Sequence, residues 1–324
     1  MLFPKTRYFQ FPFCKDMPKS AKLMHQKHEL VTKGAIFMHR TLQVPVIDAH
    51  AHIMTTERIR SGMRWLQKYL PDVDNDLTLD EPRARQMLAE AGVDYYFNAF
   101  FPIFAGTTAA VNEWNYALSL RDQRAVPFVS LLPGDEEKEN ILARAFRDNH
   151  FLGLKFHPYI QQFSILDPRL DEVYAFLQEL GRPVIIHSGH EDVYRVPDNK
   201  KEIATLLKKF PRLVLVIPHL CYPDLDSAFS FLEAHPDIYL DATNVFWCFQ
   251  KQSPKEIWWE KFEQFSERIV FGTDFTMGMA FPARLYEHFT TLPLASKTKE
   301  DLLYRTALRM ARKCGWHLDK IEVR

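Results

Sequence analysis

The stretch Val46-Ile-Asp-Ala-His-Ala-His-Ile53 combines a short apolar run with two histidines that are separated by one residue. Its length and composition are typical of a β-strand that is covered on both faces. Because successive side chains of a strand point to opposite faces, His50 and His52 share one face. Two imidazoles on one face can bind the same metal ion, so the stretch predicts a core strand and part of a metal site.

Seven further runs of this kind follow, and their starts recur at about thirty residues, the length of a βα unit. The stretches between them have helical spacing; Asp171–Leu180, for example, is followed by Gly181 at the position of a C-cap. We therefore predict a (β/α)8 TIM barrel over residues 44–324, a fold that needs ~250 residues. The expected strands are Val46–Ile53, Val93–Phe100, Val126–Leu132, Leu152–Tyr159, Val184–Ser188, Leu213–His219, Ile238–Thr243 and Ile269–Asp274.

A doubly wound α/β sheet is the competing architecture. Such sheets usually have fewer strands, and many carry a glycine-rich turn that binds phosphate. Neither G-x-G-x-x-G nor G-x-x-x-x-G-K-[ST] occurs in this sequence. The pattern therefore favours the barrel.

Residues 1–43 differ from the rest of the chain, since they hold eight Lys or Arg and two Asp or Glu and show no clean hydrophobic period. We predict an N-terminal extension that lies across the barrel and is not a separate fold. One hypothesis is that these basic residues bind a nucleic acid or a membrane. The simpler hypothesis is that the segment is only solvated. The extension could also cross a dimer interface, so a homodimer is an open expectation.

Composition narrows the class of protein. The 324 residues carry 41 basic and 41 acidic side chains, and this balance argues against nucleic-acid binding through bulk charge. A hydrophobic fraction of 47% is enough for a large core, and no apolar run approaches the length of a membrane span. The four cysteines form no C-x-x-C pair, which suggests a reducing compartment. We expect a cytoplasmic protein that acts on a small molecule, without nucleic acid or membrane.

TIM-barrel active sites lie at the C-terminal ends of the strands, and polar residues collect at those ends here. His187 and Asp274 could reach the ion that His50 and His52 bind. Three imidazoles and one carboxylate suit a zinc-like divalent ion with one position left for water. The residues at the other expected strand ends are Lys155 and His157 on the fourth, His190 just after the fifth, and His219 on the sixth.

These motifs resemble the amidohydrolase superfamily, and specifically its amidohydrolase-related branch. The likeness extends from residue 44 to about residue 280, and it implies that His50, His52, His187 and Asp274 bind the metal. It also implies that His219 lies at the site as a second ligand or a transition-state partner. The stretches that carry it are Val46–Ile53, Gly153–Pro158, Asp167–Asp171, Arg182–His187, His219 and Phe271–Asp274.

Lys155 admits two interpretations. In some members of the superfamily a lysine at the end of strand four is carboxylated and bridges two metals. The simpler interpretation is an ordinary ammonium that orients an anionic group of the substrate. Lys155 and His157 share a strand face, so either could point at the ion, and His190 is expected to line the mouth of the barrel.

The leading hypothesis is a metal-dependent hydrolase with one divalent ion. Zinc is favoured, and Mn²⁺, Fe²⁺ and Co²⁺ stay open because nitrogen and oxygen ligands discriminate poorly. The ion would lower the pKa of its water to about 7, and Asp274 would take the proton during attack on an amide, ester or lactone carbonyl. His219 would stabilise the oxyanion that develops.

Two alternatives remain. The same branch includes nonoxidative decarboxylases of aromatic or unsaturated acids, which need a cation for the carboxylate; Arg195, Arg284 and Lys155 are the candidates. A non-catalytic barrel that serves as a scaffold is the third hypothesis. The presence of all the expected ligand positions argues against it.

Overall fold

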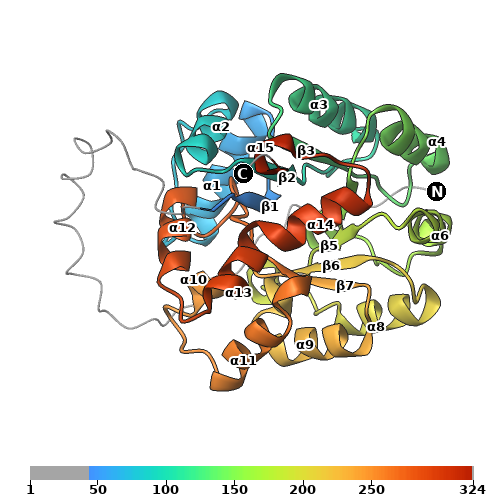
Figure 1. Cartoon of the computed structure of the whole chain (residues 1–324). Helices are drawn as coiled ribbons and strands as arrows, with labels where there is room; N and C mark the ends of the chain where they lie inside the picture. The colour runs from blue at the N-terminus through green and yellow to red at the C-terminus, as the bar shows by residue number, and fades with distance from the viewer. Residues whose placement is uncertain (1–43, 323–324) are drawn as a thin grey trace. The chain divides into compact units, whose positions relative to one another are not determined.

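The computed structural model describes residues 44–322, so the extension predicted over residues 1–43 lies outside the described residues. Eight parallel strands pair in sequential order, which confirms the predicted (β/α)8 barrel (Figure 1). Each strand lies within its expected run, except that β3 begins one residue earlier. The strands are β1 (Ile47–Ala51), β2 (Tyr95–Asn98), β3 (Ala125–Val129), β4 (Gly153–Phe156), β5 (Val184–Ile186), β6 (Leu215–Pro218), β7 (Ile238–Asp241) and β8 (Ile269–Val270).

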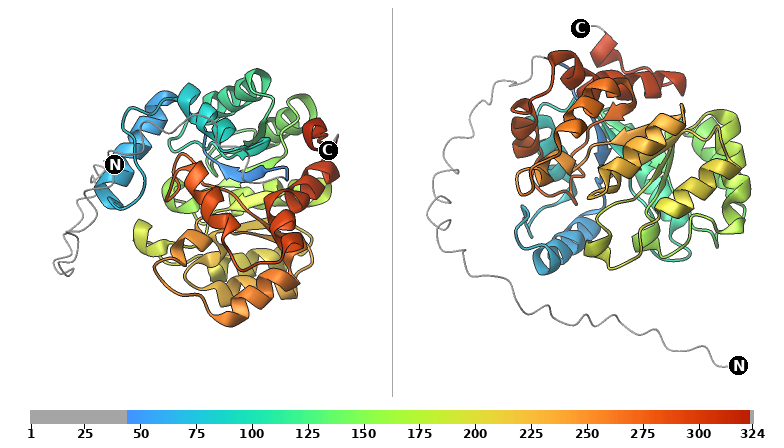
Figure 2. Two further views of the ribbon diagram at one scale, coloured as in Figure 1. Left: turned by 60° about the vertical axis from the view of Figure 1, so that its left-hand side comes forward. Right: turned by 90° about the horizontal axis from the view of Figure 1, so that it is seen from below.

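Helices connect the strands and surround them (Figures 1 and 2). As predicted, α6 is followed at its C-cap by Gly181, which has a left-handed φ of 62°. Among residues 44–322, no helix is both long and apolar enough to span a bilayer. The helices are α1 (Thr56–Tyr69), α2 (Glu81–Glu90), α3 (Thr108–Arg121), α4 (Lys138–Ala143), α5 (Pro158–Gln161), α6 (Asp171–Leu180), α7 (Glu191–Tyr194), α8 (Lys200–Lys209), α9 (Leu225–Ala234), α10 (Val245–Cys248), α11 (Glu256–Gln264), α12 (Pro282–Thr290), α13 (Ser296–Glu300), α14 (Thr306–Lys313) and α15 (Asp319–Glu322), with short 3₁₀ or π segments η1 (Arg144–Asp148), η2 (Pro168–Leu170), η3 (His219–Cys221), η4 (Ser266–Arg268) and η5 (Asp301–Arg305).

The C-terminal segment covers one end of the barrel. Met310 of α14 and Leu318 belong to the same apolar cluster as the strand residues Ile47, Phe97 and Phe128. This cluster includes residues at the first positions of several strands, so the segment covers the N-terminal end. Figure 1 shows α14 lying across the strands beside β1. The opposite end, where the strands finish, carries the polar residues.

The barrel closes between β8 and β1 through the segment that follows β8. The backbone N–H of Asp274 donates to the carbonyl of His50 over 2.7 Å. Asp48 accepts hydrogen bonds from the backbone N–H and the hydroxyl of Thr273, at 3.0 and 2.6 Å. Gly272 permits this approach, because a Cβ at that position would lie 2.6 Å from the Cβ of His50 and 2.8 Å from Oγ1 of Thr243.

Gly272→Ala should therefore destabilise the barrel. The added methyl group has no space between the two ends of the sheet, and overpacking of this kind costs about 1–3 kcal/mol. Denaturant titration followed by circular dichroism measures the free energy of unfolding. Gly134→Ala is the matched control, since a Cβ there meets its nearest atom, Nη1 of Arg169, at 3.9 Å. Equal effects of the two substitutions would contradict the packing argument.

Candidate metal centre

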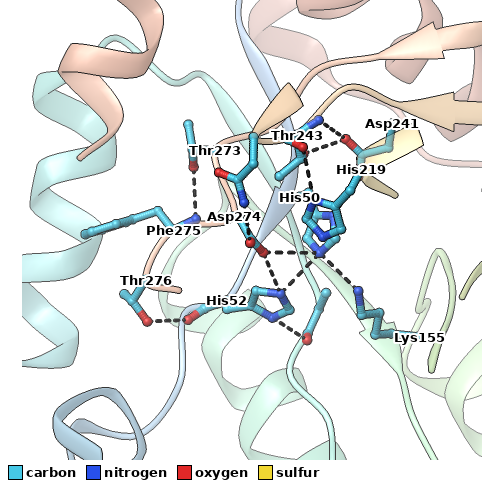
Figure 3. A network of polar contacts seen from close by, with 12 residues as sticks. His50, His52, Lys155, His219, Asp241, Thr243, Thr273, Asp274, Phe275 and Thr276 are labelled. Carbon is cyan, nitrogen blue, oxygen red and sulfur yellow. Dashed lines mark hydrogen bonds and ion pairs between the residues drawn. The ribbon is translucent and has the colours of Figure 1, made fainter. Parts of the chain in front are cut away.

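The structure brings all the predicted site residues to the C-terminal end of the barrel, together with one aspartate that the sequence analysis missed. All of them are buried. They come from six different strands or from the residues just after those strands, and Figure 3 shows most of them facing one another. The residues are His50 on β1 and His52 just after it, Lys155 on β4 and His157 just after it, His187 and His190 after β5, His219 after β6, Asp241 at the end of β7 and Asp274 after β8.

Three ligand atoms converge at the centre of this group. Nε2 of His50 lies 3.1 Å from Nε2 of His52, and the latter lies 3.1 Å from Oδ1 of Asp274. Nε2 of His50 lies 3.6 Å from the same carboxylate oxygen. The ligand atoms of these residues all lie within 4.8 Å of one another, so the three side chains could hold one ion.

Hydrogen bonds on the far side of each ring determine which nitrogen carries the proton. Nδ1 of His52 lies 2.9 Å from the carbonyl oxygen of Ala99, and Nδ1 of His50 lies 2.6 Å from Oδ2 of Asp241. A carbonyl or carboxylate oxygen only accepts, so both Nδ1 atoms donate. Each neutral ring therefore presents a lone pair at Nε2. Two lone pairs and a carboxylate that face one another need a cation between them, and the donor set fits a divalent metal.

The electrostatic environment keeps these ligands in their binding forms. Burial lowers the pKa of His50 and of His52, so both rings are neutral. Burial by itself would raise the pKa of Asp274. Its close contacts with the imidazoles of His52, His50 and His219 oppose this effect and hold the pKa of that carboxyl below its usual value. Neutral imidazoles and an ionised carboxylate are the states that bind a metal.

Asp241 is the functional residue that the sequence analysis missed. Its Oδ1 accepts hydrogen bonds from the hydroxyl and the backbone N–H of Thr243, at 2.5 and 3.0 Å, which leaves Oδ2 for His50. The contact with His50 fixes the orientation and tautomer of that ring, as carboxylates beside metal-binding histidines commonly do. The available sequence signal was a lone acidic residue at the end of the apolar run Ile238–Asp241.

His187 and His219 lie beside the converging atoms. Their ring centroids are 4.7 Å apart, and Nε2 of each is buried without a hydrogen-bond partner among the described residues. Nδ1 of His219 lies 3.0 Å from the carbonyl oxygen of Thr243, so its Nε2 also presents a lone pair. His187 is outside the group of three that lie within 4.8 Å, and its place as a metal ligand stays a prediction.

The remaining predicted residues surround this centre. Nζ of Lys155 lies 3.0 Å from Nε2 of His50, and burial lowers the pKa of the lysine to about 8 against the opposing charges of Asp274 and Asp241. His157 stacks on His187 with a centroid distance of 3.8 Å. Its Nδ1 accepts a hydrogen bond from the backbone N–H of Ile160 over 3.4 Å. The neutral ring of His157 therefore carries its proton on Nε2, unlike the rings of His50 and His219.

Backbone strain gathers at the same edge of the barrel. His190, His219, Asn244 and Asp274, which follow four consecutive strands, have φ values between 57° and 64°. Residues other than glycine adopt this left-handed region at a cost, and such positions cluster at functional sites. The strain is consistent with a loop geometry that serves the site: the side chain of Asn244, for example, donates to Oδ2 of Asp274 over 2.9 Å.

A cavity of about 270 Å³ opens from the centre. His52, Asp274 and His219 lie in its wall, and most of the remaining lining is apolar, with Trp65 among the lining residues. The only Lys or Arg that lines it in the described part of the chain is Arg58, a residue that the sequence analysis did not select.

The cations expected for a carboxylate clamp lie elsewhere. Arg195 and Arg284 are not among the described residues that line the cavity. Arg284 instead forms an ion pair with Asp74, and its guanidinium lies over the ring of Trp247. Lys155 is directed toward His50.

The chain belongs to the amidohydrolase family, whose model matches residues 47–313. The resemblance predicted from the motifs is thereby confirmed, and the fold and the His50–His52–Asp274 group define a family member with a candidate centre for a divalent metal. No curated protein matches the chain significantly.

Solved structures share the fold at low sequence identity. An uncharacterized TIM-barrel protein from Bordetella bronchiseptica is 19% identical, with a TM-score of 0.65 over 84% of this chain and 100% of its own. A 5-carboxyvanillate decarboxylase from Novosphingobium aromaticivorans, solved with bound manganese, is 13% identical, with a TM-score of 0.61 over 83% of this chain and 97% of its own. A dihydroorotase from Campylobacter jejuni is also 13% identical, with a TM-score of 0.51 over 86% of this chain and 87% of its own.

Asp241→Asn should weaken metal binding about 10- to 100-fold, because the substitution removes the negative charge that holds the donating Nδ1 of His50. Competition with a chromophoric chelator for Zn²⁺ or Mn²⁺ measures the affinity. Asp148→Asn, an exposed aspartate that pairs with Arg147, is the control and should leave the affinity unchanged. An unchanged affinity in Asp241→Asn would mean that the contact with His50 does not tune the ligand.

Proposed function

We propose that the chain is a metal-dependent hydrolase that acts on an amide, ester or lactone carbonyl of a small molecule. The observation that carries the proposal is the convergence of Nε2 of His50, Nε2 of His52 and Oδ1 of Asp274 at the wall of a cavity. Two further imidazole nitrogens, on His187 and His219, are buried there without a hydrogen-bond partner among the described residues.

His50, His52 and Asp274 would hold the ion, and His187 would be the fourth protein ligand. A divalent ion in such a site supplies a Lewis acid that activates water and polarises a carbonyl group. Zinc suits this donor set, and Mn²⁺, Fe²⁺ and Co²⁺ suit it as well. Asp241 keeps the ring of His50 in the tautomer that presents Nε2 to the ion.

Asp274 is the proposed proton carrier. Asn244 holds its Oδ2, and its Oδ1 lies beside Nε2 of His52, so the carboxylate has a fixed orientation at the wall of the cavity. It would accept the proton of the attacking water and return it to the leaving group. His219 presents a lone pair in its neutral form, so it would stabilise an oxyanion only after it gains a proton.

Nonoxidative decarboxylation of an organic acid is the second candidate. The largely apolar lining of the cavity favours it, because a carboxylate loses hydration when it enters such a site, and this loss destabilises the bound acid relative to the transition state for loss of carbon dioxide.

Oxygen-18 water separates the two reactions. The metal-loaded protein is incubated with aryl esters, lactones, N-acyl amides and hydroxybenzoic acids, and the products are weighed by mass spectrometry. We expect products that contain one solvent oxygen. Products that have lost carbon dioxide and contain no solvent oxygen would favour the decarboxylase, and turnover of every substrate class after complete metal removal would contradict both proposals.

His52→Ala should abolish the same activity, with a loss larger than the ~10–100-fold expected for a residue that only orients a ligand. The ring of His52 supplies one of the three converging atoms, and alanine has no donor. Circular dichroism checks that the variant folds, and Asp148→Asn again serves as the control. Full activity in a folded His52→Ala protein would contradict the proposed site.

Elemental analysis tests the number of ions. We expect about one divalent ion per chain, with a lower content in His187→Ala and an unchanged content in Lys155→Ala. Two ions in the native protein, reduced to one by Lys155→Ala, would instead indicate a bridging carboxylated lysine. An unchanged content and affinity in His187→Ala would exclude that residue as the fourth ligand.

A further inference from the structure

One face of α1 forms a wall of the cavity. The α1 residues that line it are Arg58, Ser61, Gly62, Trp65 and Leu66. Their spacing of three, four, seven and eight residues from the first is that of a single helical face. The buried face of such a helix is usually apolar, so a guanidinium group on this face, at Arg58, is unusual.

Arg58 is half-buried, and within residues 44–322 no carboxylate lies at ion-pair distance from it. Other arginines of the described chain do have such partners: Arg85 pairs with Glu81, and Arg124 pairs with Asp122. Burial lowers the pKa of Arg58, and no neighbouring charge opposes the shift. A half-buried cation without a counter-ion favours an anion from outside the protein.

Apart from Arg58 and the residues of the metal centre, the lining of this cavity is largely apolar and partly aromatic. The ring of Trp65 stacks on that of Tyr194 at a centroid distance of 6.1 Å and an interplanar angle of 17°. The ring of Tyr194 in turn lies 5.2 Å from that of His157 and 5.3 Å from that of His187. A flat apolar body would therefore contact aromatic side chains along the path from α1 to the imidazoles.

We propose that Arg58 determines substrate class by pairing with a carboxylate of the substrate, whose apolar or aromatic body lies against Trp65 and Tyr194. This inference rests on the proposed function, since it places the reacting group of the same molecule at the metal centre. One planar guanidinium pairs with one carboxylate through two parallel hydrogen bonds, and a cavity of about 270 Å³ suits a small molecule.

Binding of benzoate to the metal-loaded protein tests the proposal without requiring turnover. Calorimetry gives the Kd, and quenching of tryptophan fluorescence reports contact near Trp65. We expect Arg58→Gln to raise the Kd for benzoate about 10- to 100-fold, the range for loss of a charged hydrogen-bonded pair, and Arg58→Lys to raise it less. The Kd for benzamide, which has the same shape and no charge, should not change.

Arg60→Gln is the matched control, because it removes the same charge from an exposed position of the same helix. Equal weakening by Arg60→Gln would show a long-range effect of charge and overturn the proposal. No change in a folded Arg58→Gln protein would also overturn it and would place the carboxylate elsewhere, such as on the metal. Tighter binding of phenyl phosphate with the same dependence on Arg58 would overturn the assignment to carboxylates in favour of phosphate monoesters.

Failure of the Arg58 proposal can be distinguished from failure of the proposed hydrolase activity. If the oxygen-18 experiment finds no hydrolysis and benzoate binding still depends on Arg58, the anionic subsite stands and the reaction class is wrong. If hydrolysis occurs and benzoate binding is independent of Arg58, the reaction class stands and the subsite is wrong. For any substrate that the screen identifies, Arg58→Gln should raise KM more than it lowers kcat.

Discussion

His50 is the residue on which the rest of the site depends. Its Nδ1 contacts Asp241 of β7, and its Nε2 contacts His52, Asp274 and Lys155. Its backbone carbonyl accepts a hydrogen bond from the backbone N–H of Asp274. One side chain on β1 thus joins strands that are distant in sequence at the point where the barrel closes. Gly272 leaves the space that this arrangement requires. The geometry of the candidate metal site and the closure of the barrel therefore depend on the same contacts.

The facing lone pairs also link metal binding to stability. Buried acceptors that lack a donor or a cation carry a desolvation cost, and an ion that binds only the folded chain removes that cost and shifts the folding equilibrium. Lys155 offers a partial substitute, because its Nζ already contacts Nε2 of His50. The site is thus built around positive charge, whether an ammonium or a metal supplies it.

Hydrophobic pattern and strand ends were enough to predict the fold and to select His50, His52 and Asp274. Those features are local: a strand shows its period within a few residues, and H-x-H places two ligands on one face by geometry alone. Asp241 and Arg58 could not be found in this way. A single aspartate at the end of an apolar run has no period, and Arg58 on a helix resembles any solvated arginine until the fold places it in a cavity wall. Their roles depend on neighbours that are distant in sequence.

The cover over the N-terminal end of the barrel has a consequence for synthesis of the chain. Met310 and Leu318 supply part of the apolar interior, yet the ribosome makes them after all eight strands. The nascent barrel therefore exposes its inner apolar surface to solvent until the C-terminal segment emerges from the exit tunnel. Exposed apolar surface and unpaired strands of this kind make the incomplete chain prone to aggregation during this interval.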